Sequence, residues 1–519
     1  MVRQLQITLD PADLGNEEML RDKICRAAGI RPEELETFTI DRRSIDARKK
    51  PKFLLQISVY TGHDYPVPPK PVRESFKPVH SAPEVLIVGA GPAGYFAALK
   101  CLESGFKPVV IDRGKDAQSR RKDLRAIQQF SIVNPDSNYC FGEGGAGTYS
   151  DGKLYTRSKK RGSIQNVLQL LVEHGAHPDI LVDAHPHIGS NKLPRIIANI
   201  RDTILEFGGQ VLFEHRLESL EIHNSKIRKV VTNKGSFPAE RVILATGHSA
   251  RDVYRLLLKM NIRIEAKPFA LGVRIEHPQP LIDKIQYGAS PRDVNLPAAA
   301  YRLSCTLKER GVFSFCMCPG GLIVPAATAP GEIVVNGMSL SRRDSAYANS
   351  GMVVSVAVDD AIRHGYKGPL GCMDFQSSVE RSMFESGDGS QKAPAQRLGD
   401  FIKAIKSSEL PSTSYIPGLL SHRLDQLLPK DIYEHLKRAF TYFGERMPAF
   451  ITNDAIAVGV ESRTSAPVRI PRHPDTLQHP QIEGLFPCGE GAGYAGGIVS
   501  AAMDGQQVVE AIARYKNQN

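Results

Sequence analysis

The stretch VLIVGAGPAGYFAALKCLESG, residues 85–105, decides the fold of this chain. It begins with an apolar run, Val85–Val88, which is typical of a buried parallel strand. Gly89 suits the tight turn that follows, Gly91 lets a backbone approach a pyrophosphate, and Gly94 lets a helix pack closely on the strand. The small residues of Ala93–Leu102 then continue as a helix. The stretch therefore predicts the first half of a dinucleotide-binding βαβ unit.

The residues that follow complete this unit. A second strand, Pro108–Ile111, ends in Asp112, which lies 18 residues after Gly94. An acid about 20 residues after the glycines is placed to bond the ribose hydroxyls of a bound dinucleotide, while the helix N-terminus faces its phosphates. Arg113 and Gly114 come next, as in many FAD proteins.

Two other stretches match the spacing of the three glycines, at residues 142–147 and 491–496. The first has neither a strand before it nor a clear helix after it. The second follows a strand but lies 23 residues from the end of the sequence, which leaves no room for a complete βαβ unit. Only the match at Gly89 has strand, helix, second strand and acid in order.

Three segments together resemble the glutathione-reductase-like superfamily of FAD enzymes. They are the Gly89 stretch with Asp112, the stretch RVILATGHSA in which a strand ends at Thr246 and Gly247, and GLFPCGEGAGYAGGIVSAAMDG near the C-terminus. The resemblance implies FAD as cofactor, with Glu490 bonding the ribityl chain. It also implies a helix beginning near Gly496 that points its positive end at the flavin, where reduced flavin carries negative charge.

The match is closer to an uncharacterised bacterial family described as FAD-dependent or NAD(FAD)-utilising dehydrogenases. GEGGAGTYSDGKLYTR, ATGHSARD, FCMCPGG, VNGMS, GVESRTSAPVRI and GEGAGYAGGI are similar to blocks of that family, and the resemblance spans nearly the whole chain. It implies a cofactor site built from the Gly89 stretch with the end of the second strand, the block GEGGAGTYSDGKLYTR, the block ATGHSARD and the block GEGAGYAGGI. The residues are Gly89, Gly91, Pro92, Ala93, Gly94, Asp112, Arg113, Gly144, Gly145, Thr148, Ser150, Lys153, Ala245, Thr246, Gly247, Gly489, Glu490, Gly496, Gly497 and Ile498.

The chain of 519 residues is too long for one core, so several domains are expected. Residues 1–65 predict a small α+β domain with strands at Arg3–Leu9, Phe38–Asp41 and Phe53–Tyr60 and a helix over Asn16–Ala28. Residues 66–83 hold six prolines and predict a semi-rigid linker. The fold class is α/β: a Rossmann-type FAD-binding domain, residues 84–262 and 452–519, with an inserted α+β cap domain, residues 263–451, over the flavin.

Composition restricts the class of protein. The balance of 41% hydrophobic and 24% charged residues is that of a globular protein, and the longest apolar runs are too short to span a membrane. Eight irregularly spaced cysteines and the absence of a signal-peptide pattern favour the reducing cytoplasm. The net charge of +10 suits an anionic cofactor or substrate, but it also suits plain solubility.

Five residues are candidates for chemistry: Lys153, His187, Cys316, Glu461 and Arg463. Lys153 is a cation for the flavin or an anionic substrate, or part of a surface loop. His187 is an acid/base group with His185, or a core histidine. Cys316 and Cys318 are redox-active thiols or structural cysteines, and the pair lacks the further ligands that zinc would need, so no metal is expected. Glu461 and Arg463 bind an anionic group or form a salt-bridged connector.

The leading hypothesis is an FAD-dependent oxidoreductase acting on a small molecule, in which the flavin is reduced by NADH or NADPH as a transient electron donor or directly by the substrate. Two alternatives remain open. One is a flavin-dependent RNA-modifying enzyme, because residues 42–52 hold six basic residues and one acid. The other is a non-catalytic flavin-binding protein.

Overall fold

A parallel sheet forms the centre of the computed structural model, which describes residues 2–156 and 162–516. Within these residues its strands stand in the order β22–β10–β4–β5–β6, and every neighbouring pair is parallel. The two strands of the Gly89 unit lie side by side in the middle of the sheet. The mixed α/β class with a parallel sheet is thereby confirmed. The strands are β4 (Glu84–Val88), β5 (Lys107–Ile111), β6 (Gln210–Leu212), β10 (Val242–Leu244) and β22 (Leu485–Pro487).

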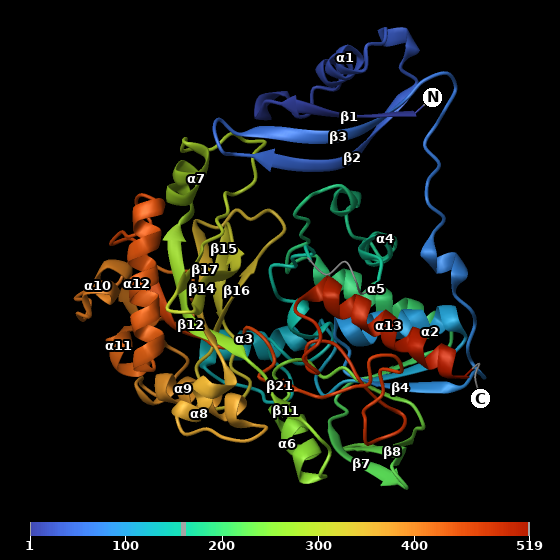
Figure 1. The fold of residues 1–519 in the computed structure, drawn as a ribbon, viewed down its shortest axis with the longest axis vertical. Coiled ribbons are helices and arrows are strands. Elements are labelled where there is room, and N and C mark those ends of the chain that lie inside the picture. The colour runs from blue at the N-terminus through green and yellow to red at the C-terminus, as the bar shows by residue number, and fades with distance from the viewer. Residues whose placement is uncertain (1, 157–161, 517–519) are drawn as a thin grey trace.

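One face of this sheet carries α2 (Pro92–Ser104), α5 (Leu193–Glu206) and α13 (Ile498–Lys516), which lie together in Figure 1. Helix α2 starts with Pro92 in its first turn and ends at Gly105, whose φ of +74° is left-handed. Helices α2 and α13 approach so closely that a Cβ on Gly505 would lie 2.1 Å from the Ala93 carbonyl oxygen. The C-terminal segment therefore returns to the first βαβ unit and packs on it.

An antiparallel sheet, β7 (Leu217–His223), β8 (Lys226–Thr232) and β9 (Gly235–Pro238), lies between β6 and β10 along the chain. These elements and the parallel sheet, residues 84–262 and 465–516, are called the parallel-sheet unit below. Its remaining helices are α3 (Arg120–Phe130), α4 (Ile164–Glu173) and α6 (Arg251–Lys259).

The N-terminal unit, residues 2–60, holds β1 (Val2–Leu9), α1 (Glu17–Ala28), β2 (Thr37–Asp46) and β3 (Lys52–Tyr60) in an antiparallel sheet of order β1–β3–β2. Asn16 caps α1 by accepting a hydrogen bond from the Met19 amide. Strand β2 is longer than the sequence predicts. It crosses a register shift between Ile40 and Arg42 and continues to Asp46, because this part also pairs with β3.

The proline-rich segment 66–83 runs from the N-terminal unit down one side of the parallel-sheet unit (Figure 1). It contains a short 3-10 helix, Val72–Ser75, whose first two amides donate to the carboxylate of Glu173. Phe76 and Val79 are buried in the core of the parallel-sheet unit. The segment is thus extended but anchored by packing.

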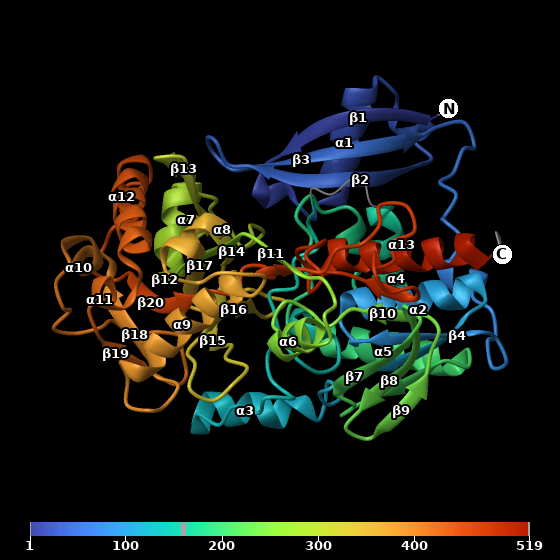
Figure 2. The same cartoon turned by 60° about the horizontal axis from the view of Figure 1, so that its bottom comes forward.

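The cap, residues 269–464, is built on a sheet of order β13–β14–β17–β12–β20–β18–β19. Its strand pairs are antiparallel except β18 with β19. Figures 1 and 2 show it beside the parallel-sheet unit, with α12 on its outer side. The strands are β12 (Phe269–Pro278), β13 (Ser304–Leu307), β14 (Arg310–Cys318), β17 (Tyr347–Val356), β18 (Ala393–Arg397), β19 (Leu419–Ser421) and β20 (Ile456–Glu461).

The helices of the cap are α7 (Gln279–Tyr287), α8 (Val358–Arg363), α9 (Gly371–Glu385), α10 (Leu398–Lys403), α11 (Leu424–Leu427) and α12 (Lys430–Arg446). A hairpin of β15 (Gly321–Pro325) and β16 (Val335–Ser339) completes it, and β11 (Glu265–Ala266) pairs with β21 (Val468–Arg469) where the chain enters and leaves. Strand β20 corrects the expected domain boundary. The sequence predicts that residues from 452 onward belong to the FAD-binding domain, but β20 pairs with β12 and β18 inside the cap.

Candidate functional site

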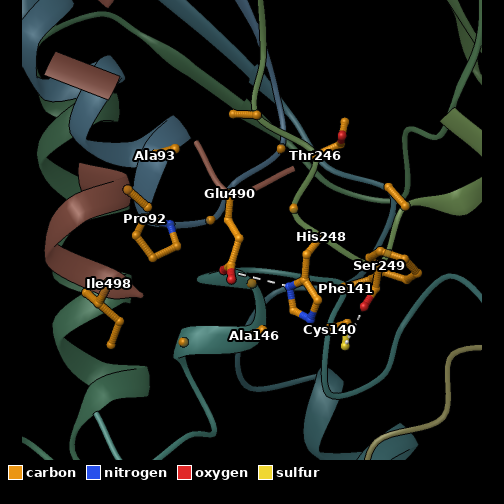
Figure 3. Close-up of a pocket in the computed structure, with 18 of the residues that line it drawn as sticks. Pro92, Ala93, Cys140, Phe141, Ala146, Thr246, His248, Ser249, Glu490 and Ile498 are labelled. Atoms are coloured by element: carbon orange, nitrogen blue, oxygen red, sulfur yellow. Dashed lines mark hydrogen bonds and ion pairs between the residues drawn. The ribbon is translucent and has the colours of Figure 1, made fainter. Parts of the chain in front are cut away.

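A cavity of about 420 Å³ lies between the parallel-sheet unit and the cap, within the range of small-molecule sites. Figure 3 shows part of its wall. The residues that line it come from every segment of the predicted cofactor site and from several others: Val88, Gly89, Gly91, Pro92, Ala93, Ile111, Asp112, Arg113, Cys140, Phe141, Gly145, Ala146, Gly147, Ser150, Asp151, Gly152, Lys153, Tyr155, His215, Arg216, Leu217, Ala245, Thr246, Gly247, His248, Ser249, Ala250, Asp252, Val253, Phe315, Cys316, Asn336, Arg463, Thr464, Glu490, Gly496, Gly497, Ile498 and Ala501.

The glycine turn between β4 and α2 contains three glycines that have different structural roles. Gly89 has a φ of +113°, and a Cβ there would lie 2.3 Å from the Ala245 carbonyl oxygen. Gly94 does not line the cavity. A Cβ on Gly94 would lie 1.8 Å from the Gly89 carbonyl oxygen, so this glycine serves close helix–strand packing. At Gly91 the nearest atom to a Cβ is the Gly145 Cα at 3.9 Å. Gly91 thus leaves open space at the N-terminus of α2.

Asp112 lies at the end of β5 and is 7% exposed. Its carboxylate accepts hydrogen bonds from the backbone amides of Ala90 at 2.8 Å, Gly114 at 2.8 Å and Gly142 at 3.1 Å. Asp112 therefore ties the glycine turn to residues 142–153, called the second glycine-rich loop below. The contact to a ribose stays a prediction, for which this carboxylate has acceptor capacity left.

The second glycine-rich loop brings Gly145, Ser150 and Lys153 to the cavity but not Gly144 or Thr148. The Thr148 hydroxyl donates to the Glu143 carbonyl oxygen at 2.8 Å, and the Gly144 amide donates to the Ala90 carbonyl oxygen at 2.8 Å. These two residues hold the loop in place. Arg157, the last residue of the matching sequence block, lies outside the described residues.

The turn after β10 places Ala245, Thr246 and Gly247 at the cavity. A Cβ on Gly247 would meet nothing within 4 Å. Among the described residues, Thr246 Oγ1 is buried without any hydrogen-bond partner. A buried hydroxyl without a partner costs free energy, so a ligand group that bonds it would be favoured.

The C-terminal segment adds Glu490 and the start of α13. Gly496 and Gly497 both leave open space, whereas Gly489 does not line the cavity and donates its amide to Asp504 at 2.7 Å. Burial raises the pKa of Glu490 to about 7, an effect that nearby Lys267 opposes. In Figure 3 the carboxyl of Glu490 faces the ring of His248, with 3.8 Å between Oε2 and Nδ1.

The cap side of the cavity consists of Phe315, Cys316, Asn336, Arg463 and Thr464. Arg463 is 5% exposed, and its Nη2 bonds Glu332 at 2.8 Å and Glu380 at 3.0 Å. Arg251 also pairs with these two acids, at 2.8 and 2.9 Å. Two guanidinium groups and two carboxylates therefore form an internally neutral cluster behind the wall. This arrangement favours the salt-bridged connector over an anion-binding fork.

Two of the catalytic candidates lie away from the cavity. His187 is held on a bridge with Lys153, and its Nε2 lies 3.2 Å from the Ser341 carbonyl oxygen. Glu461 is 1% exposed on β20 and pairs with Arg274 at 2.6 Å. Burial is the largest cause of both pKa shifts. It lowers the pKa of His187 and raises the pKa of Glu461 to about 7. Neither side chain lines the cavity.

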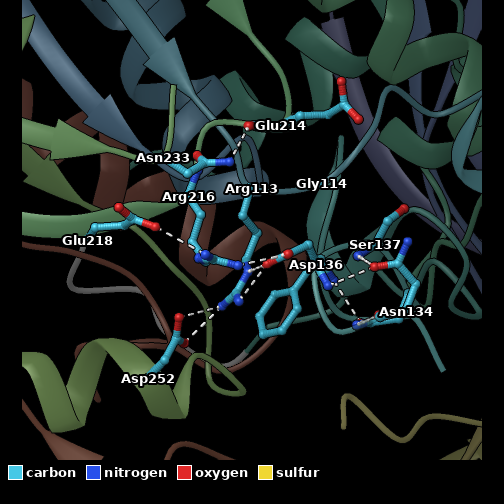
Figure 4. A network of polar contacts seen from close by, with 12 residues as sticks. Arg113, Gly114, Asn134, Asp136, Ser137, Glu214, Arg216, Glu218, Asn233 and Asp252 are labelled. Atoms are coloured by element: carbon cyan, nitrogen blue, oxygen red, sulfur yellow. Dashed lines mark hydrogen bonds and ion pairs between the residues drawn. The ribbon is translucent and has the colours of Figure 1, made fainter. Parts of the chain in front are cut away.

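One end of the cavity includes a charged network (Figure 4). Of its residues, only Arg113 was predicted from the sequence. Arg113 and Arg216 both bond Asp136, at 2.8 and 2.9 Å, and Arg113 also bonds Asp252 at 2.8 Å. The guanidinium of Arg113 also stacks over Phe141, 4.4 Å from the ring centre. Both cations are therefore already paired. Arg216 follows β6 with no local motif, so no sequence signal marked it.

Other missed residues had a visible signal. His248 and Ser249 belong to the ATGHSARD block, directly after the turn that was selected. Cys140 precedes the second glycine-rich loop, and its sulfur accepts a hydrogen bond from the Ser249 hydroxyl at 3.4 Å. Asn336 lies in the VNGMS block. These residues reach the cavity because their blocks adjoin it.

The cavity fits an extended dinucleotide cofactor. Gly91, Gly247, Gly496 and Gly497 leave backbone open along it, and Thr246 offers a hydroxyl that has no partner in the part of the chain that the structure describes. Helices α2 and α13 both begin there, and helix N-termini favour phosphates and other anions. No group of three or more metal-ligating side chains gathers in the part of the chain that the structure describes. No helix among the described residues is long and apolar enough to cross a membrane.

Comparison with solved structures finds distant likenesses. The chain is 11% identical to L-proline dehydrogenase from P. horikoshii, over 84% of this chain and 94% of that one, with a TM-score of 0.33. It is 11% identical to glycine oxidase from Bacillus cereus, over 84% and 96%, with a TM-score of 0.29. Likenesses of this level carry no argument about fold or function.

Comparison of sequences is more informative. Residues 268–464 match the family described as FAD-dependent protein, C-terminal domain-like, and residues 1–60 match a domain of unknown function. An uncharacterized protein of Clostridium beijerinckii is 40% identical over 98% of both chains. The prediction of FAD is thereby confirmed. The chain belongs to one family with this Clostridium beijerinckii protein, carries a domain of the FAD-dependent protein family, and has FAD as its cofactor.

Proposed function

We propose that this protein is an FAD-dependent oxidoreductase of a small-molecule substrate, with a Rossmann-type site of the glutathione-reductase-like kind. The observation that carries the proposal is the cavity in which the Gly91 turn, the start of α13 and the polar wall of the cap meet. When bound there, FAD supplies two-electron chemistry that side chains lack. The cap excludes water and shapes the space for a substrate.

The two ends of the cavity support an orientation for FAD. The adenosine belongs at the end with Asp112, Arg113 and Arg216, since both arginines are already paired with acids and leave no demand for a phosphate there. The pyrophosphate belongs at Gly91. The reactive ring belongs between the N-terminus of α13 and the cap, where helix ends favour negative charge.

In this orientation, Glu490 is the proposed proton-exchanging group. Its pKa, raised to about 7 by burial, places its proton exchange near physiological pH. His248 beside it stays neutral, because burial lowers its pKa to about 4. Glu490 is thus the group of the cavity most suited to hold or release a proton beside the ribityl chain or ring.

The proposed domain division keeps residues 1–65, 66–83, 84–262 with 452–519, and 263–451, except that β20 belongs to the cap. The protein is proposed to work in the cytoplasm with NADH or NADPH as a donor that binds transiently beside the cap. The RNA alternative has less support. Arg43 pairs with Asp179 and Asp183, Arg48 pairs with Asp46, and Lys50 pairs with Asp10, so three of the six basic residues of segment 42–52 are engaged within the protein.

An anaerobic titration tests the proposal. The visible spectrum of the purified, FAD-loaded protein is followed while NADH and then NADPH are added, with free FAD at the same concentration as control. Rapid bleaching of the protein-bound flavin by one of them is the expected result. A flavin that neither nicotinamide nor any metabolite mixture reduces would contradict the oxidoreductase and favour the non-catalytic flavoprotein.

A further inference from the structure

The cap wall carries two cysteines at the end of β14, Cys316 and Cys318. Cys316 lines the cavity, and Cys318 is fully buried two residues later. Two residues separate Phe315 from Cys318, whereas one residue separates their partners on β17, so the strand bulges here. Cys316 takes a φ of +48° in this bulge. A left-handed conformation at a non-glycine residue is strained, and such residues cluster at functional sites.

Two cations from different elements flank this pair. Lys153 Nζ, from the second glycine-rich loop, lies 3.8 Å from the Cys318 sulfur and donates to the Met317 carbonyl oxygen. Arg274 Nη2, from β12, also lies 3.8 Å from the Cys318 sulfur and donates to the Cys316 carbonyl oxygen at 2.7 Å. Positive charge beside a thiol favours its thiolate form.

The acids around the pair balance these cations only in part. Glu461 pairs with Arg274 at 2.6 Å, and Asp151 lies 3.5 Å from Lys153 but also pairs with Arg343 at 2.5 Å. Hydrogen bonding from Cys318 first, and then Lys153 and Arg274, lower the pKa of Cys316, while burial and Asp151 oppose them. The hydrogen bond with Cys316, and then burial, raise the pKa of Cys318, so the cysteine that faces the cavity is the more acidic of the two.

We propose that Cys316 and Cys318 are a redox-active dithiol that exchanges an electron pair with the FAD of this cavity. In the forward direction one S–S bond forms, the thiolate and the thiol together lose one proton and two electrons, and oxidised FAD would accept both electrons and that proton. In the reverse direction reduced FAD returns the electron pair, and the S–S bond breaks. A small disulfide compound is the chemical class that this pair would serve.

The proposal rests on the proposed function only in placing FAD in this cavity. A disulfide across one intervening residue closes a small, strained ring and is therefore easily reduced. The bulge and the left-handed Cys316 bend the backbone between the two cysteines. A catalytic pair needs a disulfide that is easily reduced, because a very stable disulfide would stay oxidised and could not accept the next electron pair.

Counting electrons tests the dithiol directly. The FAD-loaded protein is oxidised with ferricyanide, which leaves no adduct on a cysteine, freed of excess reagent and titrated with dithionite under argon. The wild type is expected to take up four electrons per FAD, and Cys318→Ser only two. Cys305→Ser, on neighbouring β13, is the matched control and should take up four. A wild type that takes up two electrons overturns the proposal.

A second measurement uses the protein without FAD. Mass spectrometry after the same oxidation is expected to find a bond joining Cys316 and Cys318, and iodoacetamide is expected to alkylate Cys316 at a lower pH than Cys305. Lys153→Met should shift that alkylation profile to higher pH. Failure to form the bond, together with an alkylation profile for Cys316 like that of Cys305, overturns the proposal even if Cys318→Ser proves too unstable to purify.

The two failures are distinguishable. If neither NADH nor NADPH bleaches the flavin but the wild type takes up four electrons, the dithiol stands and the proposed donor falls. If a nicotinamide bleaches the flavin and the wild type takes up two electrons, the oxidoreductase stands and the dithiol falls.

Discussion

Replacing Glu490 by Gln should stabilise the FAD-free protein at alkaline pH. The pKa of the folded carboxyl is raised to about 7 from an ordinary value of 4.5, chiefly by burial. Stability contributed by such a group is fully present below pH 4.5 and is lost as the pH rises toward 7, because ionisation is easier in the unfolded chain. Glutamine keeps the shape of the side chain but cannot ionise.

The magnitude follows from the shift. A rise of about 2.5 pKa units corresponds to roughly 3 kcal/mol when the carboxyl is ionised at pH 8. The side chain is 23% exposed, so solvent screening reduces the expected effect to about 2 kcal/mol. Neutral His248 at 3.8 Å does not offset it.

Urea unfolding at pH 5 and pH 8 measures this effect without FAD present. The free energy of unfolding of Glu490→Gln relative to the wild type is expected to increase by about 2 kcal/mol between the two pH values. Glu483→Gln, at an exposed carboxylate paired with Lys226, is the control and should show no such change. Equal pH dependence in wild type and Glu490→Gln would refute the assigned burial of this carboxyl.

Two further variants separate stability from cofactor binding. Glu380→Gln should lower the free energy of unfolding by about 3 kcal/mol, because two buried guanidinium groups lose their shared carboxylate; urea unfolding checks this against exposed Glu385→Gln, and a loss below about 1 kcal/mol would contradict it. Thr246→Val should leave the FAD-free protein at least as stable as the wild type, since its buried hydroxyl has no partner among the described residues, but should weaken FAD binding about fivefold by equilibrium dialysis. Unchanged affinity would place the cofactor away from Thr246.

The sequence predicts well those features that depend on a few adjacent residues. The order strand, Gly89 turn, helix and second strand is local, because a φ of +113° at Gly89 and the close packing at Gly94 both require glycine. Family resemblance adds Thr246 and Glu490, which reach the cavity at the ends of β10 and β22. Both sources therefore describe the parallel-sheet side of the site.

The cap side depends on contacts that the sequence does not express. Residues 456–461 form an apolar run that suits either sheet, and only pairing with β12 and β18 places them in the cap. Arg216 reaches the cavity through Asp136, which is 80 residues away in the sequence. His187 has the composition of an acid/base group, but its bridge with Lys153 holds it on Ser341. Side-chain direction in an extended segment follows from its neighbours.

The most direct test of the account is the FAD dissociation constant of Gly91→Ala. Gly91 has an extended backbone, with φ −78° and ψ −175°, and the nearest atom to its Cβ is 3.9 Å away, so alanine should fold normally. Its methyl group would occupy the space assigned to the pyrophosphate. We predict a dissociation constant at least about tenfold above that of the wild type, or about 1.4 kcal/mol, with Gly399→Ala in the cap unchanged. Equal affinity in Gly91→Ala and wild type would contradict the placement of FAD in this cavity.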